Sequence, residues 1–384
     1  MVTKEDKNYQ RCTRCVMDTT DVGIRFDENG VCDFCHNYDE KISVLNIRNE
    51  ETRAELLRIA DTIRKKGKNK KYDCIIGFSG GVDSSYVAYI AKEIMHLRPL
   101  LYCVDTGWNF EPTMNNMRSI AKKLDLDLVT EVVDWNEMAD LQLAYLKSQV
   151  IGQDTPQDHA IFAGLYNYAM KHGLKYVLSG ANLVTEWIVP GGGWDGGNDI
   201  VLLKDIHKKF GKIPLRTFPL CGMFKYKLYY QYLRGMKRIA PLNYLPFNEK
   251  EVKNFLESTL DWKGYENKHY ENLFTRWYEG YYLLRKYNYD KRITYFSNLI
   301  LAGQMSREEA LKKLEQPPYE DGESDTREIA ARLGITYEEM EAILEQENKS
   351  KSDYKNSTSK IIFAKKIAVL LGIEKRFPKR TEKG

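Results

Sequence analysis

A glycine-rich loop between an apolar segment and a helix is the part of the sequence best suited to chemistry. The loop, Ser79-Gly80-Gly81-Val82-Asp83-Ser84-Ser85, follows the apolar residues 75–78, and the pattern predicts a helix that opens at Asp83. The glycines let backbone N–H groups approach an anion, and the helix N-terminus adds the positive end of its dipole. No Lys-Ser/Thr pair follows the glycines, so this is not a Walker P-loop. We therefore expect the loop to hold a pyrophosphate group.

Four cysteines near the N-terminus have the spacing of metal ligands. Cys12 and Cys15 form one pair, Cys32 and Cys35 form a second, and sixteen residues separate the pairs. This spacing is typical of a zinc site, and four thiolates would fill a closed tetrahedral shell. Residues 27–30, Asp-Glu-Asn-Gly, predict the turn that brings the pairs together. Two disulfides are the alternative; we expect reduced thiols because no secretory segment precedes the cysteines.

Composition narrows the class of protein. The chain has 384 residues, of which 43% are hydrophobic, and a net charge of +4. A core of ordinary size is expected, and a strongly electropositive nucleic-acid binder is not. No apolar run approaches the ~18 residues that span a bilayer, so we expect a cytoplasmic protein. Six histidines are too few to suggest a His-based metal centre.

Short apolar strands alternate with helices in the middle of the chain. This alternation predicts an α/β fold, with a parallel sheet covered by helices on both faces. The expected strands are 72–77, 99–105, 126–133 and 176–180, and the expected helices are 50–66, 84–95, 114–124, 135–147 and 159–172.

Three polar segments follow the ends of predicted strands. Ser79 begins the first, Asp105 and Gly107 belong to the second, and Gly180 and Asn182 to the third. Ligands of such folds bind at the carboxyl ends of the strands. We therefore expect one site at this edge.

The remainder of the chain gives weaker signals. Residues 187–222 are predicted to be an irregular loop, a candidate lid, and the chain from about Lys225 is predicted to be helical. Residues 324–347 predict two short helices with Gly334 in the turn, and packing is favoured over DNA recognition.

A basic, aromatic stretch covers residues 224–238. Tyr226, Tyr229, Tyr230 and Leu233 have the spacing of one apolar α-helical face, which predicts a packed helix with a solvated basic side. A partner interface, a phosphate site and an RNA contact are the functional alternatives.

The glycine loop resembles the PP-loop of ATP pyrophosphatases, which cleave ATP to AMP and pyrophosphate while they adenylate a substrate oxygen. The segments 11–18, 30–35 and 77–84 together resemble the N-acetyl sugar amidotransferases of bacterial surface-polysaccharide biosynthesis. Residues 179–182 with Glu186, residues 265–269 and residues 290–292 fit the same family. The likeness covers most of residues 10–320.

The resemblance implies a reaction. The acetamido group of a nucleotide-activated sugar would become an acetamidino group at the expense of ATP and ammonia. A glutaminase that works with a cyclase-like subunit would supply the ammonia, and the sugars would be destined for lipopolysaccharide O-antigen, capsule or flagellin.

We also expect the chain to divide into four regions. Residues 1–45 would be the zinc-binding module, 46–222 the PP-loop ATP pyrophosphatase domain, 223–320 a helical substrate or partner region, and 321–384 a small helical C-terminal region.

Roles for single residues follow as hypotheses. Asp83 would bind Mg²⁺ or cap the helix, and Glu186 would be a second acidic ligand or a base. Lys204, Lys268 or Arg292 would stabilise charge on the α-phosphate, and His269 would transfer protons. The pyrophosphate and nucleotide would contact Ser79, Gly80, Gly81, Val82, Ser84, Ser85, Asp105, Gly107, Gly180 and Asn182.

The cysteines outside the two pairs do not predict a glutaminase. Residue 2 is valine, Cys221 lacks a Gly-x-Cys-x-Gly context, and Cys74 and Cys103 lie in apolar strands. We therefore expect a partner to make the ammonia. The main rival is a tRNA-thiolating PP-loop enzyme, which would need additional reactive cysteines, and a second rival is a zinc-ribbon binding module with a degenerate nucleotide domain.

Overall fold

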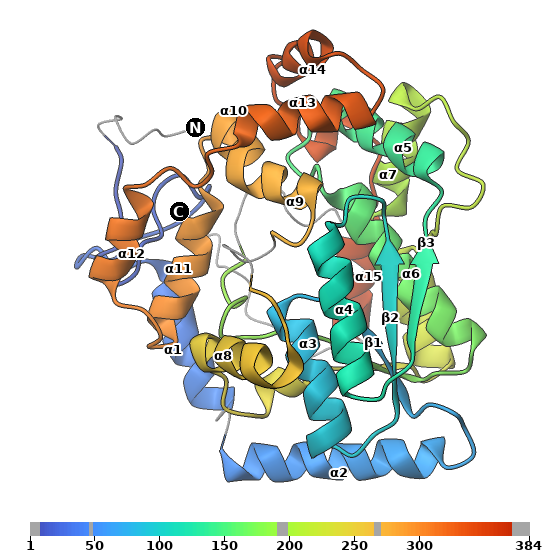
Figure 1. The fold of residues 1–384 in the computed structure, drawn as a ribbon. Helices are drawn as coiled ribbons and strands as arrows, with labels where there is room; N and C mark the ends of the chain where they lie inside the picture. Colours follow the sequence, from blue (N-terminus) through green and yellow to red (C-terminus); the bar gives the residue numbers. More distant parts are fainter. Residues whose placement is uncertain (1–7, 46–48, 190–198, 265–269, 371–384) are drawn as a thin grey trace.

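The computed structural model describes residues 8–45, 49–189, 199–264 and 270–370 (Figure 1). Its centre is a five-stranded sheet with the strand order β3-β2-β1-β4-β5, in which every neighbouring pair is parallel. The strands are β1 (Cys74–Gly77), β2 (Pro99–Asp105), β3 (Leu128–Val132), β4 (Tyr176–Leu178) and β5 (Lys237–Ile239). The predicted α/β class with a parallel sheet is therefore confirmed.

The two faces of the sheet are covered because alternate strand residues point to opposite sides. Ile76, Leu101 and Cys103 share a buried cluster with helices on one face. These helices are α2 (Glu50–Gly67), α3 (Val82–Tyr89) with its π-helical extension η1 (Ile90–Ile94), α4 (Glu111–Lys123) and α8 (Glu249–Leu260).

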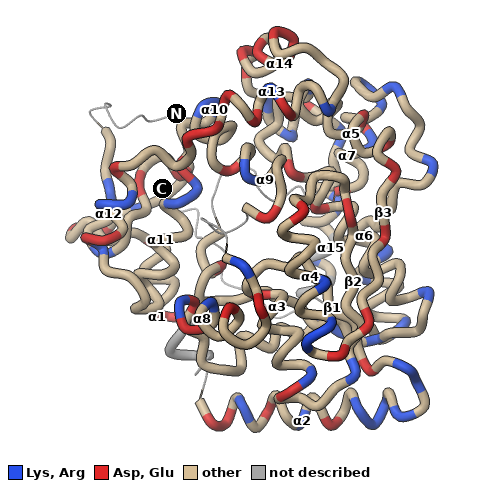
Figure 2. The backbone as a smooth tube through the Cα atoms, viewed as in Figure 1, with Lys and Arg blue, Asp and Glu red and all other residues tan. Residues whose placement is uncertain are grey.

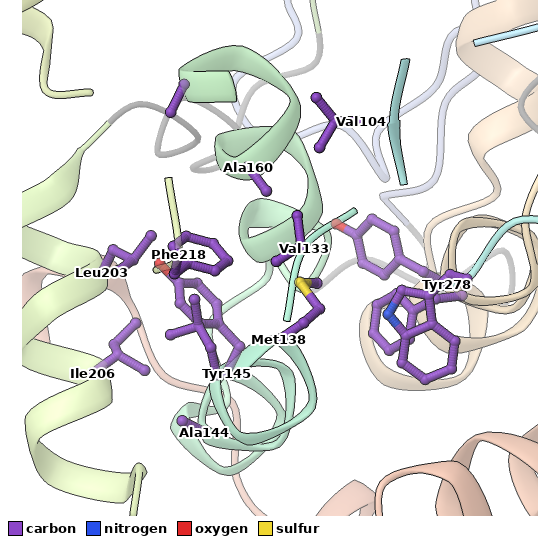
Figure 3. Close-up of a cluster of buried hydrophobic side chains, with 14 of the residues drawn as sticks. Val104, Val133, Met138, Ala144, Tyr145, Ala160, Leu203, Ile206, Phe218 and Tyr278 are labelled. Carbon is purple, nitrogen blue, oxygen red and sulfur yellow. The ribbon is translucent and has the colours of Figure 1, made fainter. Parts of the chain in front are cut away.

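Ile75 and Tyr102 belong to the cluster on the other face. There the covering helices are α5 (Trp135–Ser148), α6 (Thr155–Lys171) and α7 (Ile200–Phe210). Figure 3 shows part of this core, with Tyr145 of α5 beside Phe218 and Met138 of α5 beside Val133.

The C-terminal third is helical. Its elements are η4 (Pro241–Asn243), α9 (Leu273–Trp277), η5 (Tyr278–Tyr282), α10 (Leu283–Tyr287), α11 (Lys291–Leu301), α12 (Arg307–Leu314), α13 (Gly322–Arg332), α14 (Tyr337–Leu344), η6 (Lys351–Asp353) and α15 (Thr358–Leu370). Helices α13 and α14 match the predicted pair, with Gly334 at φ +72° between them. Ile329 and Met340 join the core of the sheet domain, so the packing interpretation of these helices is confirmed.

The stretch from 187 to 222 is not the irregular loop that the glycine run suggested. It contains α7, which begins after Asp199, whose carboxylate accepts bonds from the N–H groups of Val201 and Leu202. Leu203 and Ile206 are buried in the core shared with α5. A capped, amphipathic helix therefore follows directly on the glycines; residues 190–198 themselves lie outside the described residues.

The prediction of helix from about Lys225 onward misses strand β5. Ile239 pairs with Leu178 of β4, and the Ser179 N–H donates to the Ile239 carbonyl at 2.8 Å. The strand lies beyond residue 222, so the sheet extends past the predicted end of its domain. Three residues, two of them basic, carry too little local pattern to be read as a strand, and only the pairing with β4 defines it.

The expected apolar face of the 224–238 helix is also wrong. Tyr226 and Tyr230 are buried, whereas Tyr229 and Leu233 are exposed. The helix η3 (Lys225–Leu233) is π-helical, and the Arg234 N–H donates to the Tyr229 carbonyl five residues back. In a helix wound this widely, residues three positions apart point to different sides. The α-helical spacing therefore predicts the wrong buried face for η3.

Candidate functional site

The glycine loop is held in the shape that an anion site needs. It connects β1 to α3, and Gly80 has a φ of +76°, which an L side chain rarely adopts. Gly81 caps α3 without any side-chain hydrogen bond to the helix N-terminus. The Ser84 hydroxyl lies 3.2 Å from the Ser79 hydroxyl and donates to the Gly81 carbonyl at 3.2 Å. The loop thus presents two serines and a helix N-terminus that no side chain caps.

The segment after β4 packs directly on this helix N-terminus. A Cβ at Gly180 would lie 3.2 Å from the backbone nitrogen of Ser84, a tight contact with backbone that glycine avoids. The Asn182 amide donates to Asp83 Oδ1 at 3.4 Å, and the Asn182 N–H donates to Glu186 Oε2 at 3.3 Å. Asp83, Asn182 and Glu186 therefore form one connected polar group beside the loop.

The segment after β2 reaches the same edge of the sheet. Asp105 Oδ1 accepts from the Gly107 N–H at 2.9 Å and from the Asn109 amide at 3.3 Å. Gly107 has a φ of +85°, and its carbonyl accepts from Arg332 of α13. The structure thus places the three predicted segments at the carboxyl ends of β1, β2 and β4.

Two other predicted residues lie elsewhere. Lys204 is exposed on α7, which packs on α5 and lies well apart from α3 in Figure 1. Arg292 pairs with Asp290 at 2.7 Å and also donates to the carbonyls of Lys313 and Gln316. These contacts tie the start of α11 to the end of α12, which favours a structural role. Lys268 and His269 lie outside the described residues.

Residues far along the sequence complete the loop. The indole N–H of Trp262 donates to the Gly80 carbonyl at 2.8 Å. A Cβ at Gly81 would collide with the Glu271 carboxylate, whose residue also accepts from Thr113 through its backbone carbonyl at 2.7 Å. Glu271 was not predicted from the sequence; its only signal was its position two residues after the segment 265–269.

A second acidic group lies where α6 begins. Asp154 accepts from Gln157 at 2.7 Å and from Thr275 at 2.8 Å, and Gln157 in turn accepts from Thr106 after β2. Desolvation by the surrounding chain and the charge of Glu279, against the opposing effect of Lys291, raise the pKa of Asp158 to about 6, although part of its side chain reaches solvent. Burial, followed by the charge of Asp158, also raises the pKa of Asp154 well above its usual value.

The four N-terminal cysteines meet in one buried cluster. Their sulfurs all lie within 4.8 Å of one another, and the Sγ–Sγ distances include 3.8 Å for Cys12–Cys35 and 3.7 Å for Cys15–Cys32. A tetrahedral ion with metal–sulfur bonds of about 2.3 Å would separate its ligands by ~3.8 Å, so the donor set fits a closed four-sulfur site. The turn between the pairs is present, with the Gly30 N–H donating to the Asp27 carbonyl.

The cysteine cluster is attached to the C-terminal helices. Arg307 of α12 donates to the carbonyls of Cys12 and Cys15 at 2.9 and 3.0 Å, and the Val16 N–H donates to Ser297 of α11. In Figure 1 the N-terminal segment lies against α11 and α12, far from β3. The cluster therefore supports the C-terminal helices.

Comparison with known proteins identifies two matched regions. Residues 73–181 match asparagine synthase, and residues 271–368 match the C-terminal domain of WbpG-like LPS biosynthesis proteins. The first region contains the glycine loop, and the second begins at Glu271.

Individual relatives are distant. The chain is 24% identical over 275 residues to the uncharacterized protein MJ1599 of Methanocaldococcus jannaschii, covering 70% of this chain and 80% of that protein. A second protein of that organism, MJ0973, is 34% identical over 82 residues, 21% of this chain and 20% of its own length.

Two solved structures resemble the chain weakly. The NH3-dependent NAD synthetase of Campylobacter jejuni has 16% identity and a TM-score of 0.32, covering 68% of this chain and 95% of its own. The NMN synthetase of Francisella tularensis has 17% identity and a TM-score of 0.34, covering 86% and 98%. Scores this low carry no argument, so the fold assignment depends on the strand order.

Within the described residues, no helix combines the length and the apolarity that crossing a bilayer requires. The chain thus combines a region that matches asparagine synthase, which contains the glycine loop, with a region that matches the C-terminal domain of WbpG-like LPS biosynthesis proteins.

Proposed function

We propose that the protein converts the acetamido group of a nucleotide-activated sugar into an acetamidino group. An amide carbonyl reacts poorly with ammonia because its oxygen is a poor leaving group. In the proposed reaction that oxygen attacks the α-phosphorus of ATP, and pyrophosphate leaves. Ammonia then adds to the activated carbon, and AMP departs with the former carbonyl oxygen.

The observation that carries the proposal is the meeting of two matched regions at one loop. The glycine loop supports pyrophosphate binding through the hydroxyls of Ser79 and Ser84 and the start of α3. The WbpG-like region brings Glu271 against Gly81. A sugar bound by that region would therefore lie beside the α-phosphate of ATP, where positioning and charge stabilisation do most of the catalysis.

Two metal ions belong to the proposal. The four-sulfur cluster suits a structural zinc ion because its thiols are buried and leave no open position. Asp83 and Glu271 offer carboxylate oxygens at the glycine loop, the donor type that Mg²⁺ prefers. Mg²⁺ bound there would neutralise phosphate charge.

The other cysteines support an external source of ammonia. Cys74, Cys103 and Cys221 are all buried. Burial raises the pKa of Cys103 to about 12 and that of Cys221 to about 11, and it raises the pKa of Cys74 as well. Such thiols are poor nucleophiles at neutral pH. This favours a glutaminase partner, and it disfavours the tRNA-thiolation alternative, which needs reactive cysteines.

Product analysis tests the proposal. The protein would be incubated with ATP and ammonium and with a panel of UDP- and CMP-linked diacetamido sugars, and AMP, pyrophosphate and product mass would be measured. We expect sugar-dependent AMP and a product lighter by about one mass unit, since NH replaces O. Glutamine alone should not replace ammonium. AMP release that depends on bulk tRNA instead would move the assignment to RNA modification.

A further inference from the structure

Helix η3 presents an apolar face to solvent. Phe224, which precedes it, and Leu228, Tyr229, Tyr232 and Leu233 are each between 46% and 71% exposed. Large apolar side chains on a soluble surface are ordinary when they are scattered, but five on one short helix form a patch. We call these five residues the η3 patch.

The winding of η3 gathers the patch onto one side. A helix closed by bonds to the fifth residue back has more than four residues per turn, so positions four and five apart share a face. Residues 224, 228, 229, 232 and 233 are linked by such steps. In an α-helix, by contrast, Phe224 and Leu233 would fall on opposite sides.

The opposite side of η3 is firmly attached to α6. The ring of Tyr226 lies 4.6 Å from that of Tyr166 and 4.9 Å from that of Phe162. The Tyr230 hydroxyl donates to Asn167 at 2.7 Å. Since these contacts hold the inner side, the patch is a fixed outer surface and needs no unfolding to become available.

Charge around the patch has one sign. Residues 206–248 contain nine Lys and Arg and no Asp or Glu. Lys225 and Lys227 of η3 are exposed, as are Arg234 and Lys237 just after it. Figure 2 shows that most other helices carry both signs, which agrees with a net charge of only +4 for the whole chain. Exposed positive charge is therefore concentrated on this segment of the chain.

We propose that the η3 patch docks the protein on an anionic lipid bilayer. Leu, Phe and Tyr on one side of a short helix with Lys and Arg at its margins is the pattern of a segment that lies in the bilayer interface. The patch is small for a protein partner, because stable interfaces use about 20–30 residues a side. Leu228 and Leu233 also offer no ring on which nucleic-acid bases could stack. This inference goes beyond the proposed reaction and does not depend on it.

Vesicle sedimentation of the full chain tests the proposal. We expect binding to vesicles of phosphatidylcholine and phosphatidylglycerol and weak binding to phosphatidylcholine alone. Lys225→Glu/Lys227→Glu and Leu228→Asp/Tyr232→Asp should each weaken binding about 10-fold or more. Lys65→Glu/Lys68→Glu is the charge-matched control, and Val132→Asp, at a 71% exposed valine on β3, is the apolar control. Both controls should bind as the unmodified protein does.

Insertion is measured separately. Tyr232→Cys carrying an environment-sensitive dye should show a blue shift with anionic vesicles, and Val132→Cys with the same dye should not. Absence of vesicle binding, equal loss in the control variants, or an unshifted Tyr232→Cys signal would overturn the proposal. Capture of RNA or of an acidic protein through the same residues, without vesicle binding, would overturn it as well.

Discussion

At the scale of single residues, Asp83 is the central acid of the proposed site. It stands in the first turn of α3, beside the glycine loop, and accepts a hydrogen bond from Asn182. A carboxylate there supports charge neutralisation on the phosphates, whereas a purely capping role would need only an oxygen acceptor.

Asp83→Asn separates these roles because it keeps the shape and the acceptor and removes the charge. We expect AMP formation to fall about 100-fold or more while the melting temperature changes little. Asp61→Asn, at an exposed position of α2, is the control and should retain full activity. Normal turnover in Asp83→Asn would refute the metal-binding role.

Asp158 should give a measurable dependence of stability on pH. Desolvation by the surrounding chain, followed by the charge of Glu279, raises its pKa from 3.8 to about 6, so the folded protein holds this proton more tightly than the unfolded chain does. Stability from this group is therefore greatest at low pH and declines as the pH rises from about 4 to about 6.

Asp158→Asn should remove part of that decline, with Asp154 retaining the remainder. The variant should melt above the unmodified protein at pH 7 and close to it at pH 4. Asp127→Asn is a control of opposite sign, because the hydrogen bond from Tyr72 and the nearby Lys71 lower the Asp127 pKa. Identical melting curves of Asp158→Asn and the unmodified protein at every pH would show that the carboxyl is not perturbed.

At the scale of elements, the cysteine module and the C-terminal helices form one unit. The backbone carbonyls of Cys12 and Cys15 accept hydrogen bonds from Arg307. Phe296 and Leu314 share a buried cluster with the four cysteines. If zinc orders the two cysteine pairs, its loss should also destabilise the packing of α11 and α12, because structural zinc contributes directly to the free energy of folding.

Cys12→Ser should lower the bound zinc and reduce the melting temperature by roughly 5 °C or more. Zinc content would be measured by elemental mass spectrometry, and stability would be measured by thermal unfolding. Cys74→Ser, at a buried cysteine outside the cluster, should keep its zinc. Unchanged zinc and melting in Cys12→Ser would contradict the structural-site assignment.

Local sequence pattern was sufficient for the glycine loop, the strands β1 to β4 and the cysteine cluster. Each depends on residues close in sequence, and the alternation of strands and helices then fixes where the loops meet. Strand β5 and the π-helical winding of η3 were missed because neighbouring β4 and α6 define them, although a helix was predicted at η3. The approach of Glu271 to Gly81 joins residues 190 positions apart, and no local pattern encodes it.

At the scale of the whole molecule, the proposed ATP site adjoins a region that would bind the sugar substrate. The chain between α8 and α9 contacts the glycine loop through Trp262 and Glu271, so the sugar-binding and ATP-binding parts would share one reaction space. The acetamido oxygen is the atom that passes between them in the proposed chemistry.

The most direct measurement follows that oxygen. A nucleotide sugar with ¹⁸O in its acetamido carbonyl would be converted with ATP and ammonium, and the AMP would be analysed by mass spectrometry. The account predicts that AMP carries the label in its phosphate and that the sugar product has lost it. Unlabelled AMP, or a product that keeps its ¹⁸O, would contradict adenylation of the amide oxygen and with it the proposed function.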